Sequence, residues 1–228
     1  MLSHSRPEVD YRSFRPSMLR SKTYRHLLLL LYWPVYLLLF IFVERANPTQ
    51  GYHLMHCALD DHIPFCEAFL LPYMLWYVLL AGATVYTLLY DVDTFKRYMK
   101  YIALTYTTAI AVYLVYPTGQ NMRPAVFPRD NLLTRCMALI YQADTSTNVC
   151  PSIHVLGALG VWFAARRTKA FSTPRWKFIF GIVTLLVCLS TVFLKQHSIL
   201  DVLWALPLSL LGYGLFFRDR CLKIRHAV

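Results

Sequence analysis

Long apolar runs dominate the pattern of this chain, and short polar segments separate them. An α-helix rises about 1.5 Å per residue and the hydrocarbon core of a bilayer is about 30 Å thick, so about 20 apolar residues are enough to cross it. Six runs reach or approach this length, and we expect transmembrane helices over residues 26–43, 63–90, 101–116, 152–166, 176–194 and 197–217. The pattern therefore predicts an all-α polytopic membrane protein whose six transmembrane helices form a bundle.

The polar segments divide the rest of the chain. Residues 1–25 mix Arg with Ser and Pro and lack a helical apolar period, which predicts a mobile basic leader. Residues 26–217 would form the six-span domain, and residues 218–228 a basic tail. The longest polar segment, at about 117–151, is rich in Pro, Asn, Thr and Arg. Long loops of this kind often carry function, so we expect functional residues here.

Composition supports the membrane interpretation. Hydrophobic residues make up 57% of the 228 residues and charged residues only 15%, with a mean hydropathy of +0.42. A soluble domain is about half apolar and about a quarter charged. An aromatic content of 15% and 6 Cys in the whole chain also exclude a disordered chain and a small disulfide scaffold.

The distribution of positive charge predicts the orientation. The chain has 23 Lys and Arg against 12 Asp and Glu, a net charge of +11, which in a soluble protein would suggest nucleic acid as a partner. Eighteen of the 23 lie in residues 1–25, 91–100, 166–177 and 218–228, which share one side of a six-span topology. Because positive loops stay inside, both termini are expected in the cytoplasm of a multi-pass cell-membrane protein. The excess charge then gives no support for nucleic-acid binding, and the expected partner is the bilayer.

Three polar clusters lie at the outer ends of the predicted spans. They are the stretch from Tyr116 to Pro124, the Pro151-Ser152-Ile153-His154 sequence and the stretch from Lys195 to Asp201. Ionisable residues at this depth are costly and therefore indicate function. All three clusters face the extracytoplasmic side, so we expect an active site there.

Residue types and spacing in these clusters favour phosphoryl transfer. His197 and Asp201 are four residues apart on a predicted helix, so the carboxylate can hold one ring nitrogen and leave the other as a nucleophile or base. Ser152 and His154 open another helix, whose N-terminal N–H groups favour an anion. Arg123 adds a guanidinium suited to phosphate oxygens. Two His and one Asp among hydroxyls and an Arg suit an anion better than a dication, so we expect no metal and no cofactor.

At these residues the chain resembles the type 2 phosphatidic acid phosphatases, a superfamily of integral-membrane lipid phosphatases and phosphotransferases. The family pattern is Lys-x6-Arg-Pro, then Pro-Ser-Gly-His, then Ser-Arg-x5-His-x3-Asp. The chain matches it at Arg123-Pro124, at Pro151-Ser152-Ile153-His154, and at Ser190 followed by His197 and Asp201. The resemblance covers about residues 101–213.

The resemblance implies a reaction and a role for each residue. His197 would form a phosphohistidine, Asp201 would orient it, and His154 would protonate the leaving group. Arg123 and Ser152 would hold phosphoryl oxygens without a metal. The expected substrate is a lipid phosphomonoester or pyrophosphate, and which lipid it is stays open. A lipid head-group phosphotransferase on the same scaffold is the alternative, and a non-enzymatic anion or lipid binding or transport protein is a second one.

The chain departs from the family pattern at two cationic positions. The family Lys falls at Tyr116 and the second family Arg at Thr191. Lys195, one turn from Thr191, would replace one of the missing phosphate ligands; as an alternative, it is an interfacial lysine that reaches toward water. The lower positive charge suits a monophosphate, a phosphodiester or a head-group transferase.

Two further features are open to more than one interpretation. Cysteines on the predicted outer side either form disulfides or stay free thiols, and the sequence does not fix which; they are Cys57, Cys66, Cys136 and Cys150. The Asp60-Asp61-His62 sequence is interpreted as a solvated turn, with a small metal or lid cluster as the alternative.

Overall fold

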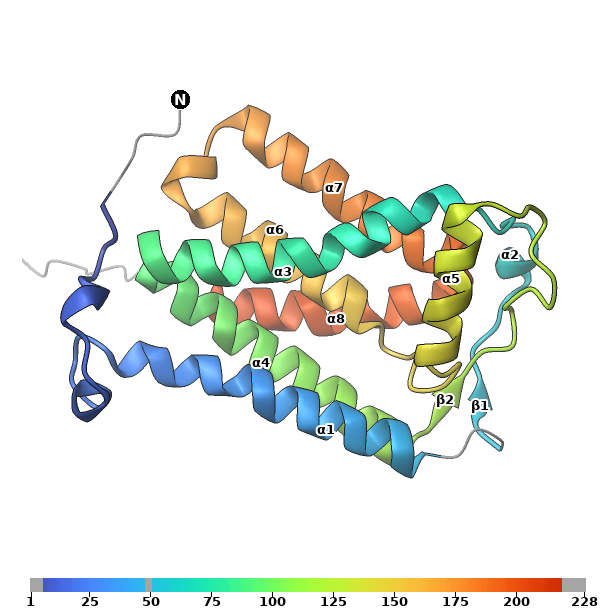
Figure 1. Cartoon of the computed structure of the whole chain (residues 1–228), viewed down its shortest axis with the longest axis horizontal. Helices are drawn as coiled ribbons and strands as arrows, with labels where there is room; N and C mark the ends of the chain where they lie inside the picture. The colour runs from blue at the N-terminus through green and yellow to red at the C-terminus, as the bar shows by residue number, and fades with distance from the viewer. Residues whose placement is uncertain (1–5, 48–50, 219–228) are drawn as a thin grey trace, which may run out of the picture.

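The computed structural model describes residues 6–47 and 51–218. The long helices run roughly along one axis, with α2, α5 and the short strands at one end and the N-terminal segment at the other (Figure 1). The long helices are α1 (Tyr32–Ala46), α3 (Leu70–Tyr90), α4 (Val92–Val115), α6 (Ile153–Arg167), α7 (Pro174–Phe193) and α8 (Ile199–Phe216). The shorter elements are the helices α2 (Ala58–Asp61) and α5 (Leu132–Ala143) and the parallel strand pair β1 (His53–Leu54) and β2 (Thr118–Gly119). The fold is therefore all-α apart from this one small pair.

Four segments of the described chain are long and apolar enough to cross a membrane. They are Arg25–Ala46, Glu67–Tyr90, Pro174–Phe193 and Ile199–Phe216, and they correspond to the first, second, fifth and sixth predicted spans. The third and fourth predicted spans form α4 and α6. Helix α4 begins with a charged stretch, and α6 has only 15 residues, eleven of them buried. The structure is thus compatible with a membrane protein.

The structure corrects several predicted boundaries. The expected loop at 91–100 is helical, because the Asp91 side chain accepts a hydrogen bond from Thr94 N at 3.0 Å and caps α4 nine residues earlier than expected. The second helix begins as a 3-10 turn at Glu67, not at residue 63. The long segment at 117–151 contains the helix α5, where we expected only a loop.

Part of the leader is held in place, contrary to the prediction of a mobile segment. Tyr11 Oη donates a hydrogen bond to Leu88 O at 2.8 Å, and Val92 N donates one to a Glu8 carboxylate oxygen at 2.7 Å. These contacts fasten residues 6–25 to the junction of α3 and α4. Residues 1–5 and the tail from 219 onward, with Cys221, lie outside the described residues.

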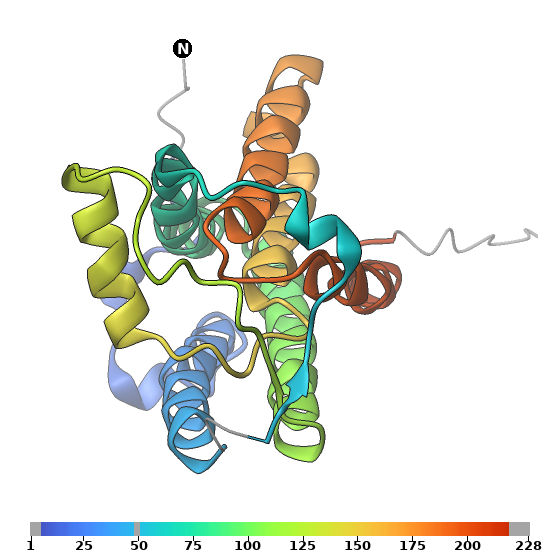
Figure 2. The ribbon, with the colours of Figure 1, turned by 90° about the vertical axis from the view of Figure 1, so that its right-hand side faces the viewer.

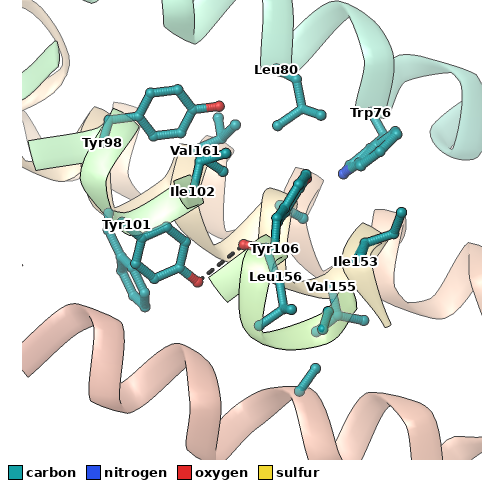
Figure 3. Packing of buried hydrophobic residues seen from close by; sticks show 14 of the residues in the cluster. Trp76, Leu80, Tyr98, Tyr101, Ile102, Tyr106, Ile153, Val155, Leu156 and Val161 are labelled. Carbon is teal, nitrogen blue, oxygen red and sulfur yellow. Dashed lines mark hydrogen bonds between the residues drawn. The ribbon is translucent and has the colours of Figure 1, made fainter. Parts of the chain in front are cut away.

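Aromatic side chains of α4 fill the space between α3, α6 and α8. Tyr101 and Tyr106 are fully buried, and Figure 3 shows them beside Leu156 of α6. Tyr101 Oη contacts Leu156 O at 3.1 Å and Ser209 Oγ at 2.6 Å, so its polar end is satisfied inside the bundle. This packing fixes α6 between its neighbours.

The starts of α6 and α8 and the end of α7 meet at the end of the bundle that α2 and α5 cover. Figure 2 looks onto this end and shows the connecting loops lying across the helix ends. The predicted clusters around Ser152 and His197 therefore come together, because each lies at a helix terminus on this side.

Candidate functional site

His197 is held at the junction of α7 and α8 by its backbone and its ring. The chain reverses at Lys195, which has a φ of 52°, and the Gln196 and His197 N–H groups both donate to Thr191 O, at 2.9 and 3.0 Å. On the other side, His197 Nδ1 lies 3.1 Å from Asp201 Oδ2. The predicted contact between His197 and Asp201 is confirmed. Asp201 also accepts from Ser198 N at 2.9 Å, so one carboxylate caps α8 and orients the imidazole.

His154 approaches the other nitrogen of His197. Its Nδ1 lies 3.3 Å from His197 Nε2. A carboxylate only accepts hydrogen bonds, so the tautomer that satisfies both contacts has the proton of His197 on Nδ1 and that of His154 on its own Nδ1. The His154 ring packs against the rings of Tyr73 and Trp76 of α3, with centroids 4.8 and 4.4 Å away.

Ser152 links the two helix starts. It caps α6, with its hydroxyl accepting from Val155 N at 3.5 Å, and its own N–H donates to Asp201 O at 3.2 Å. The N-termini of α6 and α8 thus lie side by side. Their N–H groups and the positive ends of their helix dipoles favour a negatively charged group in front of them.

The cluster is almost removed from solvent. His154, His197 and Asp201 are 7%, 5% and 0% exposed. His154 Nε2 and Asp201 Oδ1 are buried and have no hydrogen-bond partner among the described residues. Buried polar atoms are nearly always paired, so atoms left open in this way indicate a place for a ligand or for water.

Arg123 lies beside the cluster and not within it. Its guanidinium donates to the carbonyl oxygens of Tyr141, Asp144 and Thr145 at 3.1, 2.8 and 2.9 Å, and to Gln196 Oε1 at 2.6 Å. Burial lowers the pKa of Arg123, which the nearby Asp144 carboxylate partly opposes. The predicted phosphate ligand is therefore connected to His197 through the neighbouring Gln196, and its two terminal nitrogens already have partners.

Three further residues from the sequence-based prediction also have contacts in the structure: Lys195, and Thr191 and Tyr116 at the two positions that depart from the family pattern. Lys195 Nζ donates to Asp60 O at 2.8 Å. Thr191 is buried and its hydroxyl donates to Cys188 O, while Tyr116 stacks on His53 with ring centroids 3.7 Å apart. The structure thus brings His154, Ser152, His197 and Asp201 together and leaves Arg123 and Lys195 at the edge.

Asp60 belongs to the site, although the sequence analysis took it for part of a solvated turn. Its carboxylate is buried and accepts from Ser198 Oγ at 2.5 Å, Ile199 N at 2.9 Å and Cys57 N at 2.9 Å. Burial raises the pKa of Asp60, but these hydrogen bonds outweigh it and lower the pKa overall. No local pattern joins residues 138 positions apart, so only the fold reveals this contact.

The cysteines with described positions are free thiols. They are Cys57, Cys66, Cys136, Cys150 and Cys188. Burial, and then the nearby Asp201 carboxylate, raise the pKa of the Cys150 thiol to about 12, so it stays protonated at neutral pH. Over residues 6–47 and 51–218, no group of three or more His, Cys, Asp or Glu is placed to hold a metal ion.

Comparison of the chain with protein-family models, with curated proteins and with solved structures found no match. The resemblance to lipid phosphatases therefore depends on the motifs of the chain itself.

Proposed function

We propose that this protein is an integral-membrane lipid phosphatase similar to the type 2 phosphatidic acid phosphatases. The observation that carries the proposal is the buried chain of contacts from Asp201 to His197 to His154, in front of two helix N-termini. A carboxylate-oriented imidazole beside a second imidazole, in a place that favours an anion, is suited to nucleophilic attack on a phosphate.

The reaction proceeds in two steps. His154, neutral in the resting site, takes up a proton when the anionic phosphate binds. His197 Nε2 then attacks phosphorus, the bond from phosphorus to the lipid oxygen breaks, and protonated His154 gives its proton to that oxygen. His154, now neutral, then takes a proton from a water molecule, whose oxygen attacks phosphorus and breaks the bond to His197. Inorganic phosphate leaves, His154 gives up its proton, and both histidines return to their starting states. Throughout, Asp201 stabilises the positive charge that develops on His197.

The phosphoryl oxygens would be held mainly by the protein backbone. The candidates are the Ser152 hydroxyl, which caps α6, and the N–H groups of Ile153 and His154 in the first turn of this helix. Arg123 and Lys195 would supply positive charge from a short distance, because their side chains are bound to carbonyl oxygens. A site with so little direct cationic contact suits a monophosphate better than a pyrophosphate.

We further propose six spans, with the catalytic cluster on the extracytoplasmic side. Hydrogen bonds join the cation-rich segments at the opposite end of the bundle: Arg167 donates to Asp93 at 3.1 Å and Arg97 donates to Phe216 O at 2.9 Å. Positive charge gathered at one end supports a cytoplasmic location for that end. The lipid substrate would then be drawn from the outer leaflet.

The test is phosphate release by the purified full chain in lipid nanodiscs, with phosphatidic acid as the first substrate and EDTA present. We expect activity without a divalent metal and its loss in His197→Ala. The matched control is His53→Ala, which removes an exposed histidine that stacks on Tyr116. Phosphate release by His197→Ala at the wild-type rate would contradict the mechanism.

A head-group phosphotransferase is the second candidate, favoured by a cavity lined by Arg123, whose guanidinium contacts Gln196 next to His197. In that reaction an alcohol, and not water, would attack the phosphohistidine. Supplying an alcohol acceptor with a phospholipid donor separates the two, because a transferase produces a new phosphodiester and little free phosphate.

A further inference from the structure

A cavity of about 530 Å³ opens at Arg123, within the size range of about 300–1,000 Å³ for ligand sites. It lies between the segment after β2 and the segment from the end of α5 to Thr147. Arg123 forms part of its wall and also contacts Gln196, the residue before His197. The cavity is therefore linked to His197 through Arg123 and Gln196, although neither His154 nor His197 lines it.

The cavity is unsuited to a free anion. Its charged lining residues are Arg123 and Asp144, which have opposite charges and approach to 4.0 Å. The two terminal nitrogens of Arg123 are bound to carbonyl oxygens and to Gln196, and only its Nε lacks a hydrogen-bond partner among the described residues. Phosphate binding needs uncompensated positive charge, and this lining does not provide it.

The remaining lining residues are two aromatic ones, Tyr52 and Tyr141, and six with neutral hydrogen-bonding side chains. Amides come from Gln120, Asn121 and Gln142, and hydroxyls come from Thr145, Ser146 and Thr147. The Thr145 hydroxyl already donates to Glu44 and contacts the Thr147 hydroxyl, so the amides and Ser146 are the groups open to a ligand. Gln120 is fully buried, and its Nε2 has no hydrogen-bond partner among the described residues. Amides and hydroxyls both donate and accept, which is what an alcohol hydroxyl also does.

The geometry points to this cavity as a binding site for a neutral polyhydroxylated group, a sugar or polyol. Such a group offers several hydroxyls to the amides and carries no charge that would have to be neutralised. The polyol is either the head group of a lipid or a free molecule that accepts the phosphoryl group. Its role in catalysis rests on the proposed function, whereas its binding does not.

The test measures binding without turnover. Full-length protein carrying His197→Ala, in nanodiscs, is titrated with glucose, myo-inositol and glycerol by saturation-transfer NMR. In a parallel arm, native mass spectrometry compares retention of phosphatidylglycerol, which has a polyol head group, with retention of phosphatidic acid, which has none. We expect saturable binding in at least one arm, weakened tenfold or more by Asn121→Leu and by Gln142→Leu, both at exposed positions where folding tolerates change.

The matched control is Arg135→Leu, an exposed residue on the same helix as Gln142 that lies outside this cavity. It should leave binding unchanged. Binding of a free polyol would assign the site to an acceptor, and selective retention of phosphatidylglycerol would assign it to a lipid head group. Absence of saturable binding in both arms, or equal binding by the cavity variants, would overturn the inference. Phosphate release by wild-type protein is scored separately, so either proposal can fail alone.

Discussion

Two buried carboxylates hold His197 from different sides. Asp201 contacts its ring directly, and Asp60 binds Ser198 and Ile199, the two residues that follow it. The imidazole is thus fixed both through its own nitrogen and through the backbone at the start of α8. The position of one reactive nitrogen therefore depends on residues far apart in the sequence.

Asp201→Asn should reduce kcat strongly with little change in KM. An amide keeps the size of the side chain but can present an N–H to His197 Nδ1 and so favour the wrong tautomer. In a serine protease triad the corresponding change costs about 10⁴-fold, and we expect a loss of about 10²- to 10⁴-fold here. Phosphate release measures this, with the thermal unfolding midpoint as a check that the variant folds. A kcat within a few-fold of wild type would argue against the assigned role of Asp201.

Asp60→Asn should destabilise the protein and lower kcat, because the amide accepts fewer of the three hydrogen bonds. Leaving buried donors unpaired costs about 1–3 kcal/mol of unfolding free energy. The control is Asp61→Asn at the exposed neighbouring position, where surface changes stay within about 0.5 kcal/mol. Chemical unfolding and steady-state kinetics measure both effects. Equal behaviour of the two variants would show that Asp60 does not position His197.

Acid should remove the stabilisation of the folded protein that the ionised Asp60 carboxylate provides. Its pKa is lower in the folded protein than the ordinary value of 3.8, so its contribution to stability is complete above 3.8 and disappears as the pH falls through the folded pKa. The difference in unfolding midpoint between wild type and Asp60→Asn should therefore shrink between pH 5 and strongly acidic solution. A difference that stays constant over this interval would contradict the lowered pKa.

Among the long helices, α6 is the most buried, with eleven of its 15 residues removed from solvent. It carries His154 at its start and contacts α3, α4, α7 and α8. Close approach of the helices depends on small residues: Gly160 of α6 and Gly212 of α8 lie on either side of the Tyr101 ring. A Cβ at these positions would lie 2.6 and 2.7 Å from ring atoms, closer than real Cβ contacts allow.

Gly212→Ala should therefore lower stability, by about 1–3 kcal/mol from overpacking. Gly214→Ala on the same helix is the matched control, since nothing lies within 4 Å of its Cβ position. Its better helix propensity should leave stability unchanged or raise it by about 0.5–1 kcal/mol. Thermal unfolding in detergent measures both. A shift of the same sign and size in the two variants would rule out the close contact with Tyr101.

For the molecule as a whole, the two ends of the bundle differ in chemistry. The end with the leader, the α3–α4 junction and the α6–α7 loop (Figure 1) carries most of the cations, and the opposite end carries His154 and His197. With a membrane between these ends, the cations that fix the orientation would lie on one side and the residues of the proposed active site on the other.

Thiol labelling tests this orientation. In a variant without native cysteines, Asp130→Cys should react with a membrane-impermeant maleimide in intact cells, because it lies in the exposed segment before α5. Ser172→Cys, in the loop between α6 and α7, should react only after permeabilisation. The reverse pattern would place the catalytic cluster in the cytoplasm.

The sequence alone determined the features that are encoded over short distances. Apolar runs predicted the helices, because helix periodicity depends on neighbouring residues. The contact between His197 and Asp201 was also predicted, but on one face of a helix, whereas His197 precedes the N-cap Ser198 and reaches Asp201 from outside α8. The apolar runs did not predict the charged first turns of α4, which begin because Asp91 caps the helix. They also did not predict α5, because its amphipathic face lies in a segment whose average composition is polar.

Tertiary structure decided the contacts between distant segments. The approach of His154 to His197, the place of Asp60 under α8 and the carbonyl partners of Arg123 join residues from different helices and loops. These depend on how α3, α4, α6 and α8 pack, which is set by side-chain volume and by small residues at the crossings. No local pattern contains that information, so the sequence offered the candidate residues and only the fold showed how they lie relative to one another.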